Sequence, residues 1–242
     1  MTRQANKPPG ESGLYGAGHA PYPTARVGSE LGQSGVAVPG PGALLAGTLR
    51  AFVALELSPE VRAVVAALLG RLSRLEAARI ARVRWTAAEN LHLTLKFLGR
   101  VETTQLPAIQ AGLAQAAASQ GPLTLTVTGA GAFPDVRAPQ VLWLGVGAAE
   151  GALVRLAAAV EAQLAPLGFP TENRTFSPHL TLGRVGVPRH ARPLAETLVE
   201  MVAGLDEAMV EEEMVFFKSE LRPEGARHTP LFRIPLSRGG RS

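Results

Sequence analysis

Alternating apolar and polar residues along the chain predict a series of short β-strands. Residues 50–57 form the first, and residues 123–127 and 140–146 form a later pair, joined by a hairpin loop that begins at Phe133. These runs have the two-residue period of a strand with one buried face, or the continuous apolar character of a fully buried strand. Further strands are expected at residues 82–85, 92–98, 179–185, 209–221 and 231–236.

Four helices are predicted where apolar residues recur every three or four positions. They lie within residues 61–75, 106–113, 153–164 and 194–202, and the first follows Ser58 and Pro59, which are typical of a helix N-terminus. Along the chain, single helices alternate with strands that often follow one another directly. This order favours an α+β fold with antiparallel sheets over a doubly wound parallel sheet.

The two ends of the chain differ from its body. Gly and Pro make up a third of residues 1–48, which show neither a helical nor a strand period, so we expect a disordered tail there. Residues 49–237 then form the folded part, and residues 238–242 form a short basic tail. The longest unbroken apolar run, residues 63–69, is too short to cross a membrane, and no secretory signal is recognisable. We therefore expect a cytoplasmic protein that does not bind membranes, with a monomer as the simplest state.

Charge and composition exclude several kinds of site. The formal net charge is +4, but only +1 of it lies within residues 49–237, so nonspecific binding to long nucleic acids is not expected. The chain has no cysteine, which excludes disulfides and thiolate metal ligands. It has only two aspartates, and no histidine pair has the spacing of a metal-binding helix. We therefore predict neither a metal centre nor a cofactor.

The sequence His-Leu-Thr-Leu occurs twice, beginning at His92 and again at His179. Successive side chains of a strand point to opposite faces, so His92 shares a face with Thr94, and His179 shares a face with Thr181. The chain has only five histidines, and two of them occupy this identical frame. Each copy is expected to bury its leucines and to present an imidazole beside a hydroxyl.

Two imidazoles on opposite walls of a groove suit the opening of a cyclic phosphodiester. This reaction needs a base for the attacking water and an acid for the departing ribose oxygen, and histidine performs either role near neutral pH. An in-line arrangement with a hydrogen bond at each end places the two reacting nitrogens roughly 6 to 8 Å apart. Thr94 and Thr181 would donate hydrogen bonds to the non-bridging phosphate oxygens.

The surrounding residues extend this pattern. The motifs stand within residues 90–99 (NLHLTLKFLG) and 176–185 (FSPHLTLGRV), after an opening RAFVAL at residues 50–55 and before KSEL at residues 218–221. Across residues 49–237 the chain resembles the two-histidine phosphoesterase superfamily, and within it the RNA 2′,3′-cyclic phosphodiesterases, also called 2′-5′ RNA ligases.

The resemblance implies two pseudo-symmetric lobes, each an antiparallel sheet with outer helices, around a central groove. It also implies metal-independent hydrolysis of RNA 2′,3′-cyclic phosphate ends to 2′-phosphomonoesters. By analogy with the two motifs of this family, the resemblance implies that His92 is the proton donor to the 3′-oxygen and His179 is the proton acceptor from water. The motif alone does not fix that direction, because the pseudo-symmetry lets the two roles exchange.

Five other residues are weighed for the site. Lys96 shares the predicted face of His92 and would either neutralise phosphate or stand in solvent at the end of the strand. Lys218 would line the groove. Phe176 precedes the second motif and would stack a base, although aromatic residues in such positions often pack in the core. Arg184 has the opposite strand parity to His179 and is therefore the weaker candidate. His228 lacks the motif; it would contact the substrate from the rim of the groove, but we interpret it as a plain surface histidine.

Two kinds of alternative function are compatible with the same groove: the same reaction on another substrate, or binding without catalysis. The same chemistry would act on small cyclic nucleotides, on ADP-ribose cyclic phosphate or on 2′-5′-linked oligonucleotides. A protein of another class, a non-catalytic binder of nucleotides or RNA ends, would retain the groove without turnover.

Overall fold

A single antiparallel sheet, bent into two halves, forms the frame of the protein. The computed structural model describes residues 47–118, 120–223 and 225–237, so the predicted tails lie outside the described residues apart from Gly47 and Thr48. The strands are β1 (Thr48–Glu56), β2 (Arg84–Trp85), β3 (His92–Glu102), β4 (Leu123–Phe133), β5 (Val141–Ala148), β6 (His179–Arg184), β7 (Asp206–Glu211), β8 (Glu213–Arg222) and β9 (Gly225–Pro235). The helices are α1 (Pro59–Ser73), α2 (Glu76–Ile80), α3 (Leu106–Ala118), α4 (Ala152–Leu164) and α5 (Arg192–Met201).

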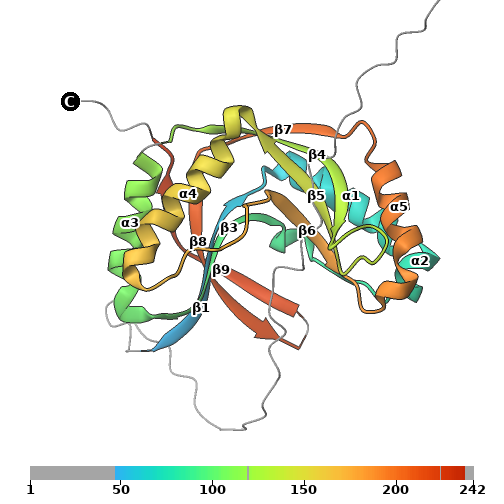
Figure 1. The fold of residues 1–242 in the computed structure, drawn as a ribbon, viewed down its shortest axis with the longest axis horizontal. Coiled ribbons are helices and arrows are strands. Elements are labelled where there is room, and N and C mark those ends of the chain that lie inside the picture. Colours follow the sequence, from blue (N-terminus) through green and yellow to red (C-terminus); the bar gives the residue numbers. More distant parts are fainter. Residues whose placement is uncertain (1–46, 119, 224, 238–242) are drawn as a thin grey trace, which may run out of the picture.

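The strand order β7-β4-β5-β6-β3-β1-β8-β9 divides the sheet into two four-stranded lobes, with β2 paired to β6. We call them the His92 lobe (β3, β1, β8, β9) and the His179 lobe (β6, β5, β4, β7). Helices α3 and α4 cover the first lobe, and α1, α2 and α5 cover the second (Figure 1). The predicted α+β fold with two antiparallel-sheet lobes and outer helices is confirmed.

One predicted strand is wrong. Residues 209–221 form two strands that separate at Glu212, because β7 pairs with β4 in the His179 lobe while β8 pairs with β1 in the His92 lobe. The chain therefore crosses between the lobes at this point. In the part of the chain that the structure describes, no helix is long and apolar enough to span a membrane.

The two faces of the His92 lobe bury different residues. The odd-numbered residues of β1, such as Val53 and Leu55, join the main hydrophobic core beneath the helices. The even-numbered residues Phe52 and Ala54 form a separate small cluster with Val215 and Phe217 of β8. This second cluster lies on the sheet face that the helices leave uncovered, which we call the groove face.

A β-bulge in β3 decides where Lys96 points. Thr94 pairs with Ala54 of β1, but Lys96 pairs with Val53, so Leu95 is the extra residue of the bulge. The bulge turns Lys96 to the helix side, where its side chain is 1% exposed. Its Nζ donates hydrogen bonds to Glu161 Oε2 of α4 at 2.5 Å and to the carbonyl oxygen of Pro170 at 2.9 Å. The prediction that Lys96 binds substrate is therefore wrong, and this lysine is part of the core.

We expect Lys96→Ala to lower the free energy of unfolding by about 3 kcal/mol, because it leaves the Glu161 carboxylate without its partner in a largely buried position. Urea unfolding followed by circular dichroism measures the change. The double variant Lys96→Met with Glu161→Leu removes both charges, and it should recover most of the loss. A single variant as stable as the wild-type protein would show that the ion pair is not needed.

Candidate active site

The two motif strands meet at one cross-strand pair, Leu93 of β3 with Leu180 of β6. Both leucines are fully buried on the helix side. Because the strands are antiparallel, the neighbouring residues on the groove face lie opposite each other as His92 with Thr181 and Thr94 with His179. The two histidines are thus diagonal neighbours, a relation that corresponds to about 7–8 Å in a regular sheet. The distance of roughly 6 to 8 Å between the reacting nitrogens stays a prediction, because the sheet spacing refers to the bases of the side chains and not to the imidazole rings.

Each catalytic candidate is oriented by the backbone two residues before it. His92 Nδ1 lies 2.7 Å from the carbonyl oxygen of Asn90, and His179 Nδ1 lies 2.7 Å from that of Ser177. A carbonyl oxygen only accepts, so both Nδ1 atoms carry a proton and donate it. The Nε2 atoms are then the nitrogens available for proton transfer. All four motif side chains, those of the two histidines and two threonines, are half-buried.

The turn before His92 is held from two sides. Arg62 of α1 donates from Nη1 to the carbonyl oxygens of Ala88 at 2.8 Å and Leu91 at 3.1 Å. Asn90 Nδ2 donates to the carbonyl oxygen of Ala226 in β9 at 2.7 Å. The carbonyl that accepts the hydrogen bond of His92 Nδ1 therefore belongs to a turn that is fixed to both a helix and a distant strand.

Aromatic rings surround His92 on its own lobe. Its ring stacks on Phe52 with centroids 4.7 Å apart, and Phe217 lies 5.2 Å from Phe52 and 6.3 Å from His92. His228 of β9 meets His92 edge-on at 5.3 Å and Phe52 edge-on at 4.9 Å. The interpretation of His228 as a plain surface histidine is wrong. The pairing of Ser219 with His228 brings this side chain to the groove face, and no local sequence signal indicates it.

His179 has different neighbours. Phe133, the last residue of β4, meets it edge-on at 5.0 Å, and Trp143 of β5 lies 6.5 Å away. Gly131 makes room for this indole, because a Cβ atom at that position would lie 2.4 Å from Trp143 Cζ2. Phe176 instead packs against the main core. The aromatic contacts of His179 therefore come from β4 and β5, the other strands of its own lobe. Phe176 as a base-stacking residue stays a prediction without support from these contacts.

Burial lowers the pKa of both histidines. For His92, removal from water is the main cause and brings the pKa to about 4, against the hydrogen bond to Asn90, with smaller contributions from His228, Arg62 and His179. Burial also lowers the pKa of His179, and the positive charge of Arg184 adds to this effect. The electrostatic effect of His179 on His92 is consistent with their closeness in the groove.

A second bulge brings Arg184 to the groove face. Thr181 pairs with Trp143 and Gly183 pairs with Leu142, so Leu182 is the extra residue and Arg184 regains the face of Thr181. Arg184 was considered the weaker candidate because of its parity, and the bulge overturns that reason. Lys218, in contrast, was predicted to line the groove but does not face it. It lies on the face of β8 opposite Phe217 and forms an ion pair with Glu220 at 2.8 Å, so its predicted place in the groove is wrong.

Metal ligands do not gather in the described part of the chain. Within residues 47–118, 120–223 and 225–237, no group of three or more His, Cys, Asp or Glu side chains is arranged to hold a metal ion.

Together, the two lobes and their paired His-x-Thr strands define a two-histidine phosphoesterase. The chain belongs to the 2′-5′ RNA ligase superfamily, whose family model matches residues 65–212. It is 34% identical over 188 residues to the RNA 2′,3′-cyclic phosphodiesterase of Methanothermobacter thermautotrophicus, an alignment that covers 77% of this chain and 99% of the relative. It is 32% identical over 154 residues to the Escherichia coli protein of the same name, covering 64% and 80%.

Solved structures agree with this assignment. The crystal structure of E. coli LigT complexed with 3′-AMP is 31% identical, with a TM-score of 0.62, covering 78% of this chain and 99% of that one. A crystal structure of a protein from Thermus thermophilus is 27% identical, with a TM-score of 0.64, covering 79% of this chain and 100% of that one.

We expect the His92 imidazole to stay neutral in the free protein until the pH falls to about 4, with its proton on Nδ1. Inorganic phosphate should raise this pKa, because an anion beside the ring favours the imidazolium form. Nitrogen-15 NMR of the ring nitrogens measures both properties. His190, an exposed residue of another turn, should not respond to phosphate. A protonated His92 at about pH 6 without ligand would contradict the expectation.

Proposed function

We propose that this protein hydrolyses the 2′,3′-cyclic phosphate at the end of an RNA to a 2′-phosphomonoester, without a metal ion. The observation that carries the proposal is the antiparallel pairing of the two motif strands. It makes His92 and His179 diagonal neighbours on one face of the sheet, each with Nδ1 bonded to a backbone carbonyl. The names of the relatives, RNA 2′,3′-cyclic phosphodiesterase, support the choice of substrate. LigT crystallised with 3′-AMP supports binding of a nucleotide in this fold.

The proposed reaction takes one proton from the attacking water and delivers another to the departing 3′-oxygen. His179 Nε2 accepts a proton from water, and the water oxygen forms a bond to phosphorus. The bond from phosphorus to the 3′-oxygen breaks in line with this attack, and His92 Nε2 gives its proton to that oxygen. The product keeps its phosphate on the 2′-oxygen. Exchange of protons with solvent then returns both imidazoles to their starting states.

Three further side chains fit the charge of the phosphate. Thr94 and Thr181 stand beside the histidines on the groove face and would donate to the non-bridging oxygens. Arg184 is placed on the same face by the bulge at Leu182, and it would offset the negative charge. In this proposal Arg184 is the cationic substrate-binding residue, in place of the predicted Lys96 and Lys218.

The low pKa of His92 constrains how the donor obtains its proton. A donor with a pKa of about 4 is mostly neutral near neutral pH in the free protein. The negative charge of the bound phosphodiester raises the pKa of an adjacent imidazole, so His92 takes up its proton together with the substrate.

The cytoplasmic location and the monomeric state remain predictions.

Single substitutions separate an enzyme from a binder. His92→Ala and His179→Ala should each lower turnover of an RNA with a 2′,3′-cyclic phosphate end about 10²- to 10⁴-fold, since each removes one proton-transfer step. Product analysis by chromatography identifies the 2′-phosphate, with EDTA present to remove metal ions. Binding of 3′-AMP should change much less. Equal product from the wild-type protein and both variants would mean that the protein is a binder.

We expect kcat/KM to fall as the pH rises from about 6 to about 8. Only the form of the free protein with one protonated and one neutral histidine is active, and both pKa values are lowered from 6.5 by burial. Raising the pH above these values removes the donor proton, whereas lowering it below about 4 protonates both rings. Rates measured across this pH range at limiting substrate give kcat/KM, and rates at saturating substrate give kcat. A kcat/KM that rises over the same range would contradict the expectation.

A further inference from the structure

Groove-facing residues continue along β3 beyond the catalytic motif. The two bulges of β3, at Leu95 and Leu98, place Phe97 opposite Phe52 and Arg100 opposite Arg50. The even-numbered residues of β1 face the groove, so Phe97 and Arg100 face it as well. The row on this face therefore runs from the histidine and threonine through an aromatic ring to a pair of arginines.

Phe97 is 40% exposed, so part of its aromatic surface is open to solvent. It lies 5.8 Å from Phe52, the ring on which His92 stacks. A partly exposed aromatic surface thus adjoins the catalytic histidine and extends toward the end of the strands. Bases of single-stranded nucleic acids stack on such surfaces.

Arg50 and Arg100 lie directly opposite each other on β1 and β3. Both are exposed, and neither forms an ion pair with a carboxylate among the residues that the structure describes. Glu102, the nearest acidic residue along this face, caps the 3₁₀ turn η2 (Thr103–Gln105) through its carboxylate. Like charges directly opposite in a sheet destabilise it, so the pair costs stability unless an anion neutralises it.

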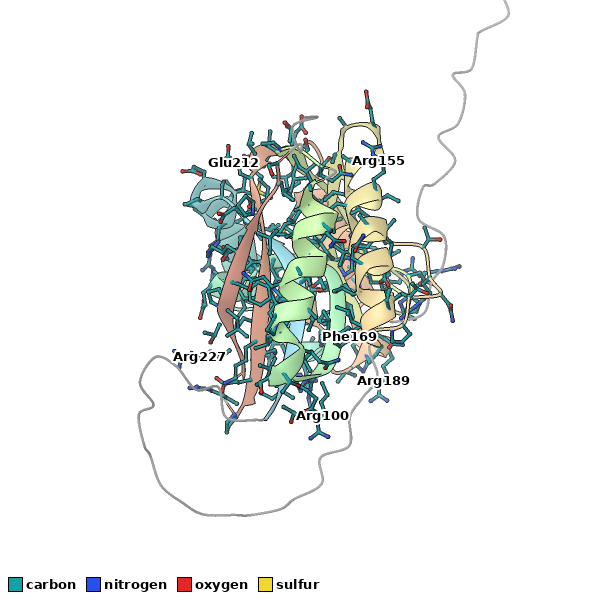
Figure 2. The ribbon with its side chains drawn as sticks, turned by 90° about the vertical axis from the view of Figure 1, so that its left-hand side faces the viewer. Arg100, Arg155, Phe169, Arg189, Glu212 and Arg227 are labelled. Atoms are coloured by element: carbon teal, nitrogen blue, oxygen red, sulfur yellow. The ribbon has the colours of Figure 1, made fainter. Side chains whose placement is uncertain are left out.

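The arginine pair stands near the ends of β1 and β3 on the groove face, a position that we call the rim. Arg50 is four residues from Ala54, the partner of Thr94, which corresponds to about 13 Å along the strand. Figure 2 shows Arg100 at the lower end of the molecule, near the end of its strand. A cyclic mononucleotide bound at the histidines has no second phosphate to reach this rim, whereas an RNA chain has one.

We propose that Arg50 and Arg100 form a rim subsite that binds the phosphate on the 5′ side of the terminal nucleotide. The inference rests on the proposed function and adds to it a second contact, through which the protein would distinguish an RNA chain from a cyclic mononucleotide. Phe97 lies between the reacting phosphate and this second one, under the terminal base. The rim subsite adds affinity but no chemistry, so it acts on KM and leaves kcat nearly unchanged.

Three substrates test the proposal: 2′,3′-cyclic AMP, the same nucleotide with a 5′-phosphate, and a dinucleotide that ends in a 2′,3′-cyclic phosphate. In the wild-type protein, kcat/KM should rise about 10-fold from the first to the second, and the third should be at least as good as the second. Arg50→Gln and Arg100→Gln should each remove most of this gain through KM. Both variants should hydrolyse 2′,3′-cyclic AMP within about twofold of the wild-type rate.

The control variant is Arg155→Gln, which changes an exposed arginine at the other end of the molecule (Figure 2) and should alter none of the three rates. Arg50→Lys should restore part of the gain, since a lysine keeps the charge. The dependence of KM on salt should weaken by about 0.7 in the logarithmic slope when the phosphate contact is lost. Thermal melting should show both glutamine variants at least as stable as the wild-type protein, because each removes a repulsion.

The outcomes are distinct. If no substrate is opened, the proposed function itself fails. If 2′,3′-cyclic AMP is opened as efficiently as the other two, or if the arginine variants affect all three substrates equally, the rim subsite is wrong while the function stands. A gain that appears only with the dinucleotide would also overturn it, because the added nucleoside rather than the phosphate would then be recognised.

Discussion

One cross-strand contact, the pairing of Leu93 with Leu180, determines the site. It is the single register point between β3 and β6, and it joins two four-stranded lobes into one sheet. A slip by one residue would turn the histidine of the slipped strand into the core and a leucine into the groove. The burial of both leucines beneath the helices opposes such a slip. The face on which both motif histidines lie is therefore secured by apolar packing on the far side of the sheet.

The two lobes repeat each other in backbone detail beyond the motif. Each strand has a bulge at the third residue after its histidine, at Leu95 in β3 and at Leu182 in β6. In both strands the fifth residue after the histidine therefore returns to the groove face. That residue is Phe97 in one lobe and Arg184 in the other. The same geometry thus supplies an apolar surface on one wall and a cation on the opposite wall.

These bulges also explain which sequence predictions failed. The two histidines, their threonines and most strands were recognisable because alternation holds over the short His-Leu-Thr stretch. Counting parity further along the strand gave the wrong face for Lys96 and Arg184, since an unpaired residue shifts the count and no residue type announces it. Phe52 and His228 were missed as neighbours of His92 for another reason. They come from β1 and β9, and only long-range strand pairing brings them there.

The symmetry of the backbone does not extend to the electrostatics of the two imidazoles. His92 lies among Phe52, Phe217 and His228, and the loss of water in this cluster lowers its pKa to about 4. A ring that holds its proton weakly releases it readily to a departing alkoxide, provided that the substrate brings enough negative charge to protonate it first. In the proposed mechanism, the aromatic cluster thus links protonation of His92 to binding of the substrate. An empty site would rest with both histidines neutral near neutral pH, and the acid would form only where an anion is bound.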